Sequence, residues 1–256
     1  MGYVPFELHG KVALVTGGTT GLGLAMATAL ADAGADVCVW GRDRARNRAA
    51  TAALRRGGGR ALAVACDVAD EAAVERAFTE TLEAFGRVDA CFANAGTDGL
   101  AASFVELSLA EWRRVVAVNT DGAFLTLRAA ARHMIARGGG GSLVVTSSIA
   151  AISGRPGREH YTASKGALLS LVRSLAVELG RFGIRANALL PGPIETEMAA
   201  KAPDRERIRR RVVERVPLGR PGAPHELGGI AVYLASDASS YHTGDMLVVD
   251  GGYTAA

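Results

Sequence analysis

The stretch VALVTGGTTGLG, residues 12–23, decides the fold. Its first five residues form an apolar run typical of a buried strand, and four glycines lie among the next seven residues, where a helical apolar pattern begins. Glycines at this point let the backbone turn sharply and approach a pyrophosphate, whose charge lies against free N–H groups at the helix N-terminus. The position between a first strand and a helix is informative, because an isolated glycine cluster is a weak signal. The stretch therefore favours a dinucleotide-binding loop over an ordinary tight turn.

Apolar runs and helical patterns alternate along the rest of the chain. Six more short apolar runs predict strands: Val37–Trp40, Ala61–Cys66, Ala90–Ala93, Leu143–Ser147, Arg185–Leu190 and Met246–Val249. Between them lie predicted helices: Leu22–Ala33, Arg44–Arg55, Glu71–Phe85, Leu109–Arg137 with an interruption near Gly122, and Tyr161–Phe182. Seven strands separated by helices predict a parallel sheet covered on both faces. No linker, repeat or charge block divides the sequence, so we expect a single doubly wound α/β domain over residues 1–256.

The charge balance and hydropathy exclude several classes of protein. The chain has 29 basic and 26 acidic residues and a net charge of only +3. Its densest basic run, Arg205–Arg215, contains two glutamates, and we interpret it as a solvated helix face. We therefore expect no nucleic-acid partner. We expect no signal peptide, and because no run of about 18 apolar residues occurs, we also expect no membrane span.

The three cysteines, Cys38, Cys66 and Cys91, all lie in strand-like apolar runs. An odd number of isolated thiols argues against a disulfide framework and for a reducing compartment, so we expect a cytoplasmic location. None of them has metal-ligand spacing, and the five histidines are scattered along the chain. We expect no metal site.

Tyr161 and Lys165 lie four residues apart in the segment YTASK. Four residues is just over one helical turn, so both side chains project from the same face. The ammonium favours the phenolate and is expected to lower the pKa of Tyr161 from about 10 toward neutrality. A phenol tuned in this way gives or takes a proton at neutral pH. Such a spacing also occurs by chance on helices, and only the other motifs decide between these interpretations.

Ser148 lies thirteen residues before Tyr161, at the end of the predicted fifth strand. Its hydroxyl is suitably placed to polarise a carbonyl group. Ser147 is its neighbour, and in a strand the two side chains face opposite sides of the sheet, so only one can point at Tyr161. The spacing selects Ser148.

Six motifs occur in one order along the chain: Thr16–Gly23 (TGxxxGxG), Asn94–Gly96 (NAG), Asn119, Ser148, Tyr161–Lys165 (YxxxK) and Pro191-Gly192. In these motifs the chain resembles the short-chain dehydrogenase/reductase family, from Lys11 to Tyr253 and including the closing VVDGGY. The resemblance implies a single-domain Rossmann fold, a nicotinamide cofactor and the interconversion of a ketone and a secondary alcohol. Similar proteins include 3-oxoacyl carrier-protein reductases and sugar or polyol dehydrogenases. It also implies a homotetramer in which the last strand packs between subunits.

The resemblance assigns cofactor contacts along the chain. Asp67 would hydrogen-bond the adenine amine with Val68 flanking the ring, although Asp67 alone could also cap the following helix. Asn94 would lie beside the adenosine ribose and brace the sheet. The Ile194 backbone and the Thr196 hydroxyl would contact the nicotinamide carboxamide. The full predicted set is Gly17, Thr19, Thr20, Gly21, Leu22, Gly23, Arg42, Asp67, Val68, Asn94, Ala95, Gly96, Tyr161, Lys165, Pro191, Gly192, Ile194 and Thr196.

The residues after the second predicted strand bear on the choice of cofactor. An acidic residue there would bind both ribose hydroxyls and repel a 2′-phosphate, but this chain has Gly41. Arg42 follows, and its guanidinium could pair with a 2′-phosphate. Asp43 more plainly caps the next helix, whereas Thr20 stands where many NADP enzymes have a basic residue. The sequence favours NADP(H), with NAD(H) as the alternative.

The resemblance also implies a catalytic set of Asn119, Ser148, Tyr161 and Lys165. Tyr161 would exchange the proton with the substrate oxygen, and Ser148 would hold that oxygen as an oxyanion donor does. Lys165 would lower the pKa of the tyrosine and bind the nicotinamide ribose. Asn119 would position a water that links Lys165 to solvent. The cofactor would carry the hydride, and the protein would supply orientation and electrostatics.

Three segments would wall the substrate site at the carboxyl ends of the strands: residues 97–104, 149–160 and 193–217. The last is predicted to be a lid. Arg155 and Arg158 either attract a carboxylate or phosphate or are ordinary surface arginines. The expected partner is a small ketone or alcohol. The alternatives are an NAD-dependent alcohol or polyol dehydrogenase and a non-catalytic dinucleotide-binding regulatory protein, which would be expected to lack one of the four catalytic residues.

Overall fold

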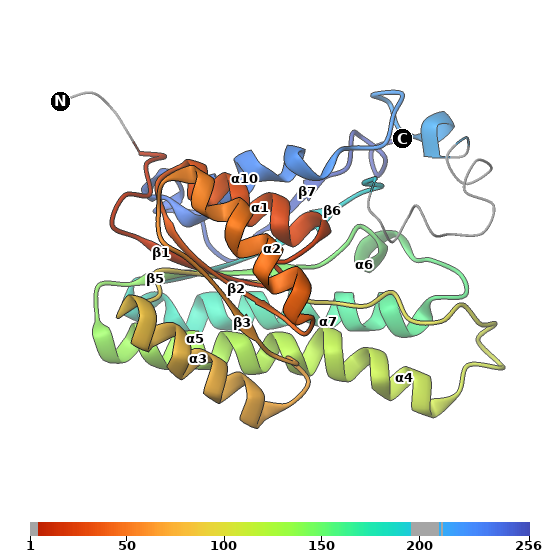
Figure 1. Ribbon diagram of the computed structural model, residues 1–256. Coiled ribbons are helices and arrows are strands. Elements are labelled where there is room, and N and C mark those ends of the chain that lie inside the picture. Colours follow the sequence, from red (N-terminus) through yellow and green to blue (C-terminus); the bar gives the residue numbers. More distant parts are fainter. Residues whose placement is uncertain (1–4, 196–209, 211) are drawn as a thin grey trace.

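Seven parallel strands form one sheet in the order β3-β2-β1-β4-β5-β6-β7. The computed structural model describes residues 5–195, 210 and 212–256 (Figure 1). The strands are β1 Val12–Thr16, β2 Asp36–Gly41, β3 Ala61–Ala65, β4 Ala90–Ala93, β5 Gly141–Thr146, β6 Ile184–Pro191 and β7 Met246–Val249. The predicted seven-stranded doubly wound sheet is confirmed.

Helices cover both faces of the sheet (Figure 1). On one face lie α1 Gly21–Asp32, α2 Arg44–Leu54 and α10 Gly228–Ala235. On the other face lie α3 Glu71–Phe85, α4 Leu109–Val116, α5 Gly122–Arg137 and α7 Glu159–Leu179. A π-helical turn, Ala117–Asp121, joins α4 to α5, and α6 Ala150–Ser153 precedes α7. Short 3-10 turns occur at Arg55–Gly57, Gly180–Phe182, Pro224–Leu227 and Asp237–Ser239. None of the helices within the described residues is long and apolar enough to cross a membrane.

The central strands are apolar on both faces because both faces are covered. All five residues of β1 and all four of β4 are buried. Two hydrophobic clusters result, one under each helical layer. The strand order reverses between β1 and β4, which pair directly in the sheet. Ligands of open α/β sheets bind beside such a reversal, at the carboxyl ends of the strands.

Two helices of the structure, α6 and α10, were not expected from the sequence. The α10 segment, GGIAVYLA, is apolar on every side and has two glycines at its start. It therefore lacks the amphipathic period by which a surface helix is recognised. The helix α6 has only four residues and carries no periodicity at all.

Candidate active site

The glycine loop holds backbone in conformations that a side chain would prevent. Gly17 and Gly21 have φ angles of +62° and +55°, in the left-handed region. A Cβ on Gly23 would lie 2.3 Å from the Gly17 carbonyl oxygen, and one on Gly17 would lie 2.9 Å from the Ala95 Cα. Because these backbone atoms cannot move aside, the glycine loop keeps this conformation against the NAG segment only if Gly17 and Gly23 have no side chain.

The N-terminus of α1 follows directly in this loop, and no side chain caps it. Thr20 is the N-cap residue, yet its side chain makes no capping hydrogen bond, and no acidic residue lies in the first turn. The first N–H groups and the positive end of the helix dipole thus favour an anion. With the close backbone approach at Gly17 and Gly23, these groups fit the pyrophosphate of a nicotinamide dinucleotide.

The NAG segment is fastened to the end of β1. The Asn94 side chain donates from Nδ2 to the Thr16 carbonyl at 3.0 Å, and the backbone N–H groups of Asn94 and Ala95 both donate to Thr16 Oγ1 at 3.0 Å. A Cβ on Gly96 would lie 3.2 Å from both Asn119 Oδ1 and Lys165 Nζ. The segment therefore connects the glycine loop to two predicted catalytic residues.

The structure corrects one interpretation at the end predicted to hold the adenosine. Asp70, not Asp67, is the N-cap of α3, and its carboxylate accepts from Ala72 N and Ala73 N. The Asp67 carboxylate instead accepts from Ala69 N at 3.1 Å and lies 3.9 Å from Arg42 Nη1. Asp67 is thus free of the capping role and exposed at the end of β3.

Other residues near this end have structural contacts of their own. Val68 is buried, and a Cβ on Gly122 would lie 2.6 Å from its Cγ2. Asp43 caps α2, as predicted, by accepting from Ala45 N and Arg46 N. The arrangement leaves Arg42, whose side chain is 76 % exposed, as the cation beside Gly41.

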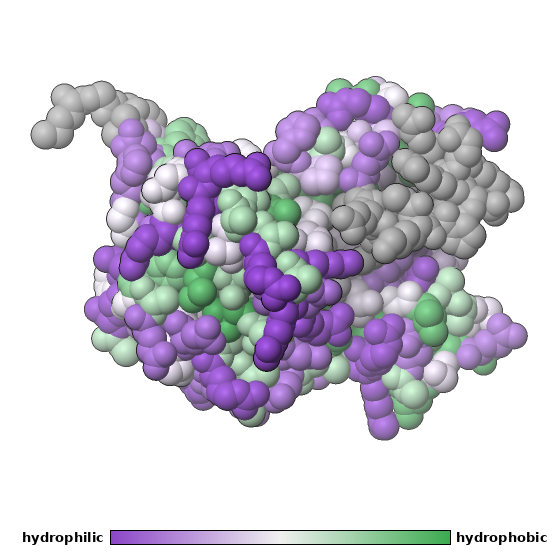
Figure 2. Space-filling view, in the orientation of Figure 1, coloured by the Kyte–Doolittle hydropathy of each residue, from purple (hydrophilic) through white to green (hydrophobic). Residues whose placement is uncertain are grey.

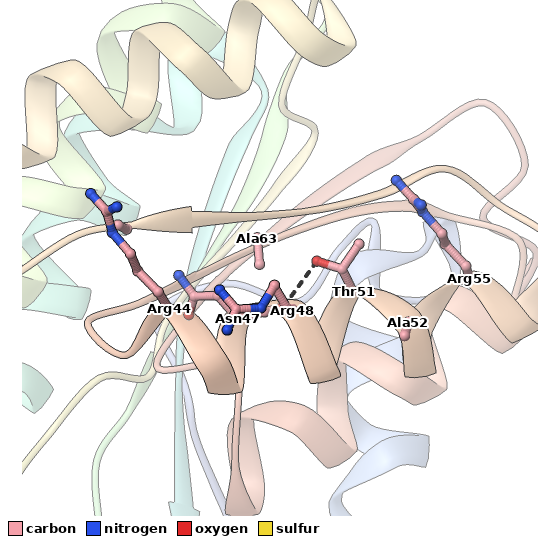
Figure 3. Close-up of a pocket in the computed structure, with 8 residues that line it drawn as sticks. Arg44, Asn47, Arg48, Thr51, Ala52, Arg55 and Ala63 are labelled. Atoms are coloured by element: carbon pink, nitrogen blue, oxygen red, sulfur yellow. Dashed lines mark hydrogen bonds between the residues drawn. The ribbon is translucent and has the colours of Figure 1, made fainter.

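An open hollow of about 450 Å³ lies between α2 and β3 (Figure 3). Arg44 and Arg55 stand at its two ends, and Ala63 points into it from the strand. It is lined by Arg44, Asn47, Arg48, Thr51, Ala52, Arg55, Ala63 and Ala65. Sequence reasoning did not single it out, although seven arginines against one acidic residue in positions 42–60 are a visible signal.

Tyr161 and Ser148 meet at the carboxyl end of β5. Ser148 follows the strand by two residues, and its side chain lies close enough to the phenol of Tyr161, in the first turns of α7, to lower the pKa of that phenol. Its neighbour Ser147 is buried and donates to the Lys165 carbonyl at 2.8 Å. The two serines therefore have separate tasks, as the alternation along a strand predicts.

Lys165 lies on the same side of α7 as Tyr161 but is aimed at the sheet. Its ammonium donates to the Thr146 carbonyl at 2.7 Å and lies 6.0 Å from the centre of the Tyr161 ring. The side chain is 4 % exposed, and burial lowers the pKa of Lys165 to about 8.

The predicted effect of Lys165 on the phenol is not what the structure shows. Burial raises the pKa of Tyr161, and the hydrogen bond from Ser148 lowers it in part. Asp98 raises this pKa further and Arg155 lowers it. Lys165 is not among these causes, because its ammonium is directed to Thr146 and is itself destabilised by burial.

Asn119 lies in the π-helical turn and is completely buried. Its Oδ1 accepts from Thr97 N at 2.8 Å, while Nδ2 donates to the Thr97 carbonyl at 3.0 Å and to Ser164 Oγ at 2.9 Å. Such π-helical turns within a helix are frequent at functional sites. Here the amide links the loop after β4 to α7.

The last predicted cofactor segment follows β6. Gly192 donates to the Val249 carbonyl at 2.9 Å, and a Cβ on it would lie 2.4 Å from the Asp250 Cβ. Ile194 forms a bridge with Gly222. Thr196 and much of the predicted lid at 193–217 lie outside the described residues.

Comparisons with known proteins agree with this geometry. Residues 17–254 match the family described as "Enoyl-(Acyl carrier protein) reductase". The L-rhamnose 1-dehydrogenase (NAD(P)(+)) of Sphingomonas sp. (strain SKA58) is 41 % identical over 246 residues, which are 96 % of each chain. The 2,5-dichloro-2,5-cyclohexadiene-1,4-diol dehydrogenase of Sphingobium indicum is 38 % identical over 97 % of this chain and 99 % of its own.

A solved structure is similar over nearly the whole chain. It is a gluconate 5-dehydrogenase of Burkholderia cenocepacia J2315 in complex with NADP and tartrate, with a TM-score of 0.93 and 36 % identity over 98 % of both chains. The sequence match, the sheet and the arrangement of the motifs lead to one conclusion. The chain belongs to the short-chain dehydrogenase/reductase family and is an oxidoreductase that acts on CH–OH groups with NAD(P).

Proposed function

We propose that the protein interconverts a ketone and a secondary alcohol, with Tyr161 as the general acid and base. The observation that carries this is the approach of the Ser148 hydroxyl to the Tyr161 phenol, whose pKa it lowers, with the Lys165 ammonium 6.0 Å from the phenol ring. In reduction, Tyr161 donates its proton to the carbonyl oxygen while Ser148 donates a hydrogen bond to the same oxygen. In oxidation the phenolate removes the hydroxyl proton. NAD(P) supplies or accepts the hydride when bound.

Lys165 and Asn119 return the proton in this proposal. Both side chains reach the same place beside Gly96, where a Cβ would lie 3.2 Å from each. A buried ammonium with a pKa of about 8 gives up a proton near neutral pH more readily than an exposed lysine does. Lys165 is thus suited to re-protonate Tyr161, and Asn119 holds the loop through which the proton leaves.

We further propose that NADP(H) is preferred to NAD(H). Gly41 places no carboxylate at the end of β2, and the exposed Arg42 follows it. The arginines of the hollow beside α2, Arg44 and Arg48, add positive charge to this surface, where hydrophilic side chains gather (Figure 2). A 2′-phosphate brings additional negative charge, which such a field favours. The carboxylate of Asp67, 3.9 Å from Arg42, opposes this preference.

Turnover of a panel of ketones and alcohols with NADPH and NADH tests both proposals. The native enzyme should favour NADPH, and Arg42→Gln should raise the KM for NADPH about tenfold with little effect on NADH. Arg56→Gln removes an equally exposed charge at the other end of α2 and should change neither. Tighter binding of NADH by the native protein contradicts the cofactor proposal. Cofactor binding without turnover of any substrate supports a non-catalytic protein instead.

Gly41→Asp is a poorer probe of cofactor choice than Arg42→Gln. A Cβ at Gly41 would lie 2.7 Å from both Thr19 Oγ1 and Asn47 Oδ1. The added carboxylate would therefore displace part of the glycine loop as well as change the charge. Arg42 is exposed and can be replaced without such a displacement.

We also propose that residues 1–256 act as one cytoplasmic domain with a substrate lid over 193–217, assembled as a homotetramer. The continuous sheet supports the single domain. The edge strand β7 supports the assembly, because its apolar residues are only partly buried. The three buried thiols, with pKa values raised to about 12, suit a reducing compartment.

A further inference from the structure

Two loops that flank Tyr161 are joined by an ion pair. Asp98 lies two residues after Gly96, and Arg155 lies between Ser148 and Tyr161 in the sequence. Arg155 Nη1 is 2.8 Å from Asp98 Oδ1. Both charges act on the phenol of Tyr161, since the carboxylate raises its pKa and the guanidinium lowers it. A Cβ on Gly99, the residue after Asp98, would lie 2.2 Å from Nε2 of His160, which precedes Tyr161 in α7, so the pair lies beside the turn of α7 that holds Tyr161.

The backbone around Asp98 is held from two sides. The Arg158 side chain, only 19 % exposed, donates to the carbonyls of Asp98, at 3.3 Å, and Gly99. The next residue, Leu100, donates its N–H to Glu111 Oε1 at 2.6 Å. Nη1 of Arg158 thus holds the backbone of the loop, and most of this side chain is withdrawn from solvent. The Asp98 carboxylate is consequently pre-organised, which reduces the entropy cost of binding through it.

Arg155 differs from Arg158 in being more exposed to solvent and to a ligand. Its side chain is 50 % exposed, and within the described residues its one hydrogen bond runs from Nη1 to Asp98. Nε and Nη2 are therefore available to a ligand. Asp98 Oδ2 lies 3.5 Å from Arg158 Nη2, beyond a short hydrogen bond, and keeps acceptor capacity. The pair offers an acceptor and a donor side by side.

The chemistry of the pair selects among substrates. A simple ketone would displace water from the ion pair, and it has no hydroxyl groups to replace the hydrogen bonds that the water made with the two side chains. An anionic substrate would be attracted by Arg155 but repelled by Asp98. Hydroxyl groups both donate and accept, so adjacent hydroxyls can satisfy the carboxylate and the guanidinium together.

We propose that Asp98 and Arg155 recognise substrate hydroxyl groups, and that the substrate is a neutral polyhydroxylated alcohol or its oxidised form, as in sugars and polyols. This rests on the proposed function at Tyr161 and adds the class of molecule that reaches it. It also replaces the alternative interpretation in which Arg155 and Arg158 attract a carboxylate or phosphate, because the Asp98 carboxylate lies within ion-pair distance of both guanidinium groups.

Asp98→Asn and Arg155→Gln test the proposal on a panel of three kinds of substrate. These are neutral sugars and polyols, a cyclic ketone without other hydroxyls, and a sugar acid. For the neutral polyhydroxylated substrates, kcat/KM should fall about 10- to 100-fold in each variant. For the simple ketone it should change by less than about threefold. Arg132→Gln is the matched ion-pair control, because it removes a partner 3.4 Å from Glu75 on α3. It should leave kcat/KM unchanged for the polyhydroxylated substrates and for the simple ketone.

The pH dependence of turnover on the simple ketone is a second measurement. A purely structural role of Asp98 and Arg155 would not change it. Besides Asp98 and Arg155, Ser148 lowers the pKa of the phenol, and the Lys165 ammonium, directed to Thr146, lies 6.0 Å from the ring centre. Asp98→Asn should lower the pH midpoint assigned to Tyr161, and Arg155→Gln should raise it, since the two charges act in opposite directions.

The outcomes separate this proposal from the proposed function. Equal losses on all three kinds of substrate, no loss on any, or a native preference for the sugar acid that Arg155→Gln abolishes would each overturn hydroxyl recognition. In each of those cases Tyr161-dependent turnover would persist. An enzyme that turns over no substrate, or whose Tyr161→Phe variant keeps its activity, would instead overturn the proposed function itself.

Discussion

Lys165 carries an electrostatic penalty that its position in the site imposes. Its folded-state pKa is about 8, against about 10.4 for a lysine in an unfolded chain. Below pH 8 both states hold the proton and the penalty, about 3 kcal/mol, is fully present. Between pH 8 and 10.4 only the unfolded chain holds it, so native stability rises with pH over this interval.

Lys165→Met should therefore be more stable than the native protein at pH 7, although it loses the hydrogen bond to the Thr146 carbonyl. The advantage should shrink as the pH rises from 8 to 10. Denaturant unfolding of both proteins across this range measures it. Lys11→Met, which removes an ammonium paired with Asp237 at the surface, should show no such trend. A Lys165→Met difference that is constant with pH would contradict the assigned penalty.

The glycine loop sets what α1 can bind. Gly23→Ala places a Cβ 2.3 Å from the Gly17 carbonyl oxygen, so the loop or the first turn of α1 must move. We expect the Kd for NADPH, measured by fluorescence titration, to rise at least about tenfold. Gly229→Ala is the matched control, because nothing lies within 4 Å of a Cβ at that helical glycine. Equal Kd values for the two variants would show that the loop does not hold the cofactor.

The elements that the sequence predicts well are those with a clear pattern. The bounds of β1, α3, β4 and β7 agree with the predicted ones, because each is a distinct apolar run or an amphipathic helix with a capping residue. The interruption near Gly122 appears as the π-helical turn before α5. The segment of α10, apolar on all sides, gives no period to detect.

The parts of the site that lie in local sequence motifs were predictable from the sequence. The glycine loop, the NAG segment and the Ser148–Tyr161 pair are local patterns whose positions follow from the strand order. The partnership of Asp98 and Arg155 spans 57 positions, and no local pattern reports it. The predicted lowering of the Tyr161 pKa was wrong for a related reason. The burial of the phenol and the direction of the Lys165 ammonium both depend on tertiary packing.

Apolar side chains are partly exposed at the edge strand β7. Val248 of this strand is 41 % exposed, and Leu109 and Phe124 on α4 and α5 are also exposed. We expect light scattering to give four times the mass of the chain. Val248→Lys should shift the protein to smaller species, because a charge on an edge strand opposes pairing. A native monomer would contradict the proposed tetramer, and an unchanged tetramer in the variant would exclude β7 from the interface.

The central claim is that Tyr161 exchanges the proton with the substrate oxygen. Tyr161→Phe keeps the ring and removes the hydroxyl whose pKa the Ser148 side chain lowers. Turnover and NADPH binding measured on the same preparation test it most directly. We expect kcat to fall by about 10²- to 10⁴-fold, while the Kd for NADPH stays within about threefold of the native value. A variant that binds NADPH normally and keeps substantial turnover would contradict it.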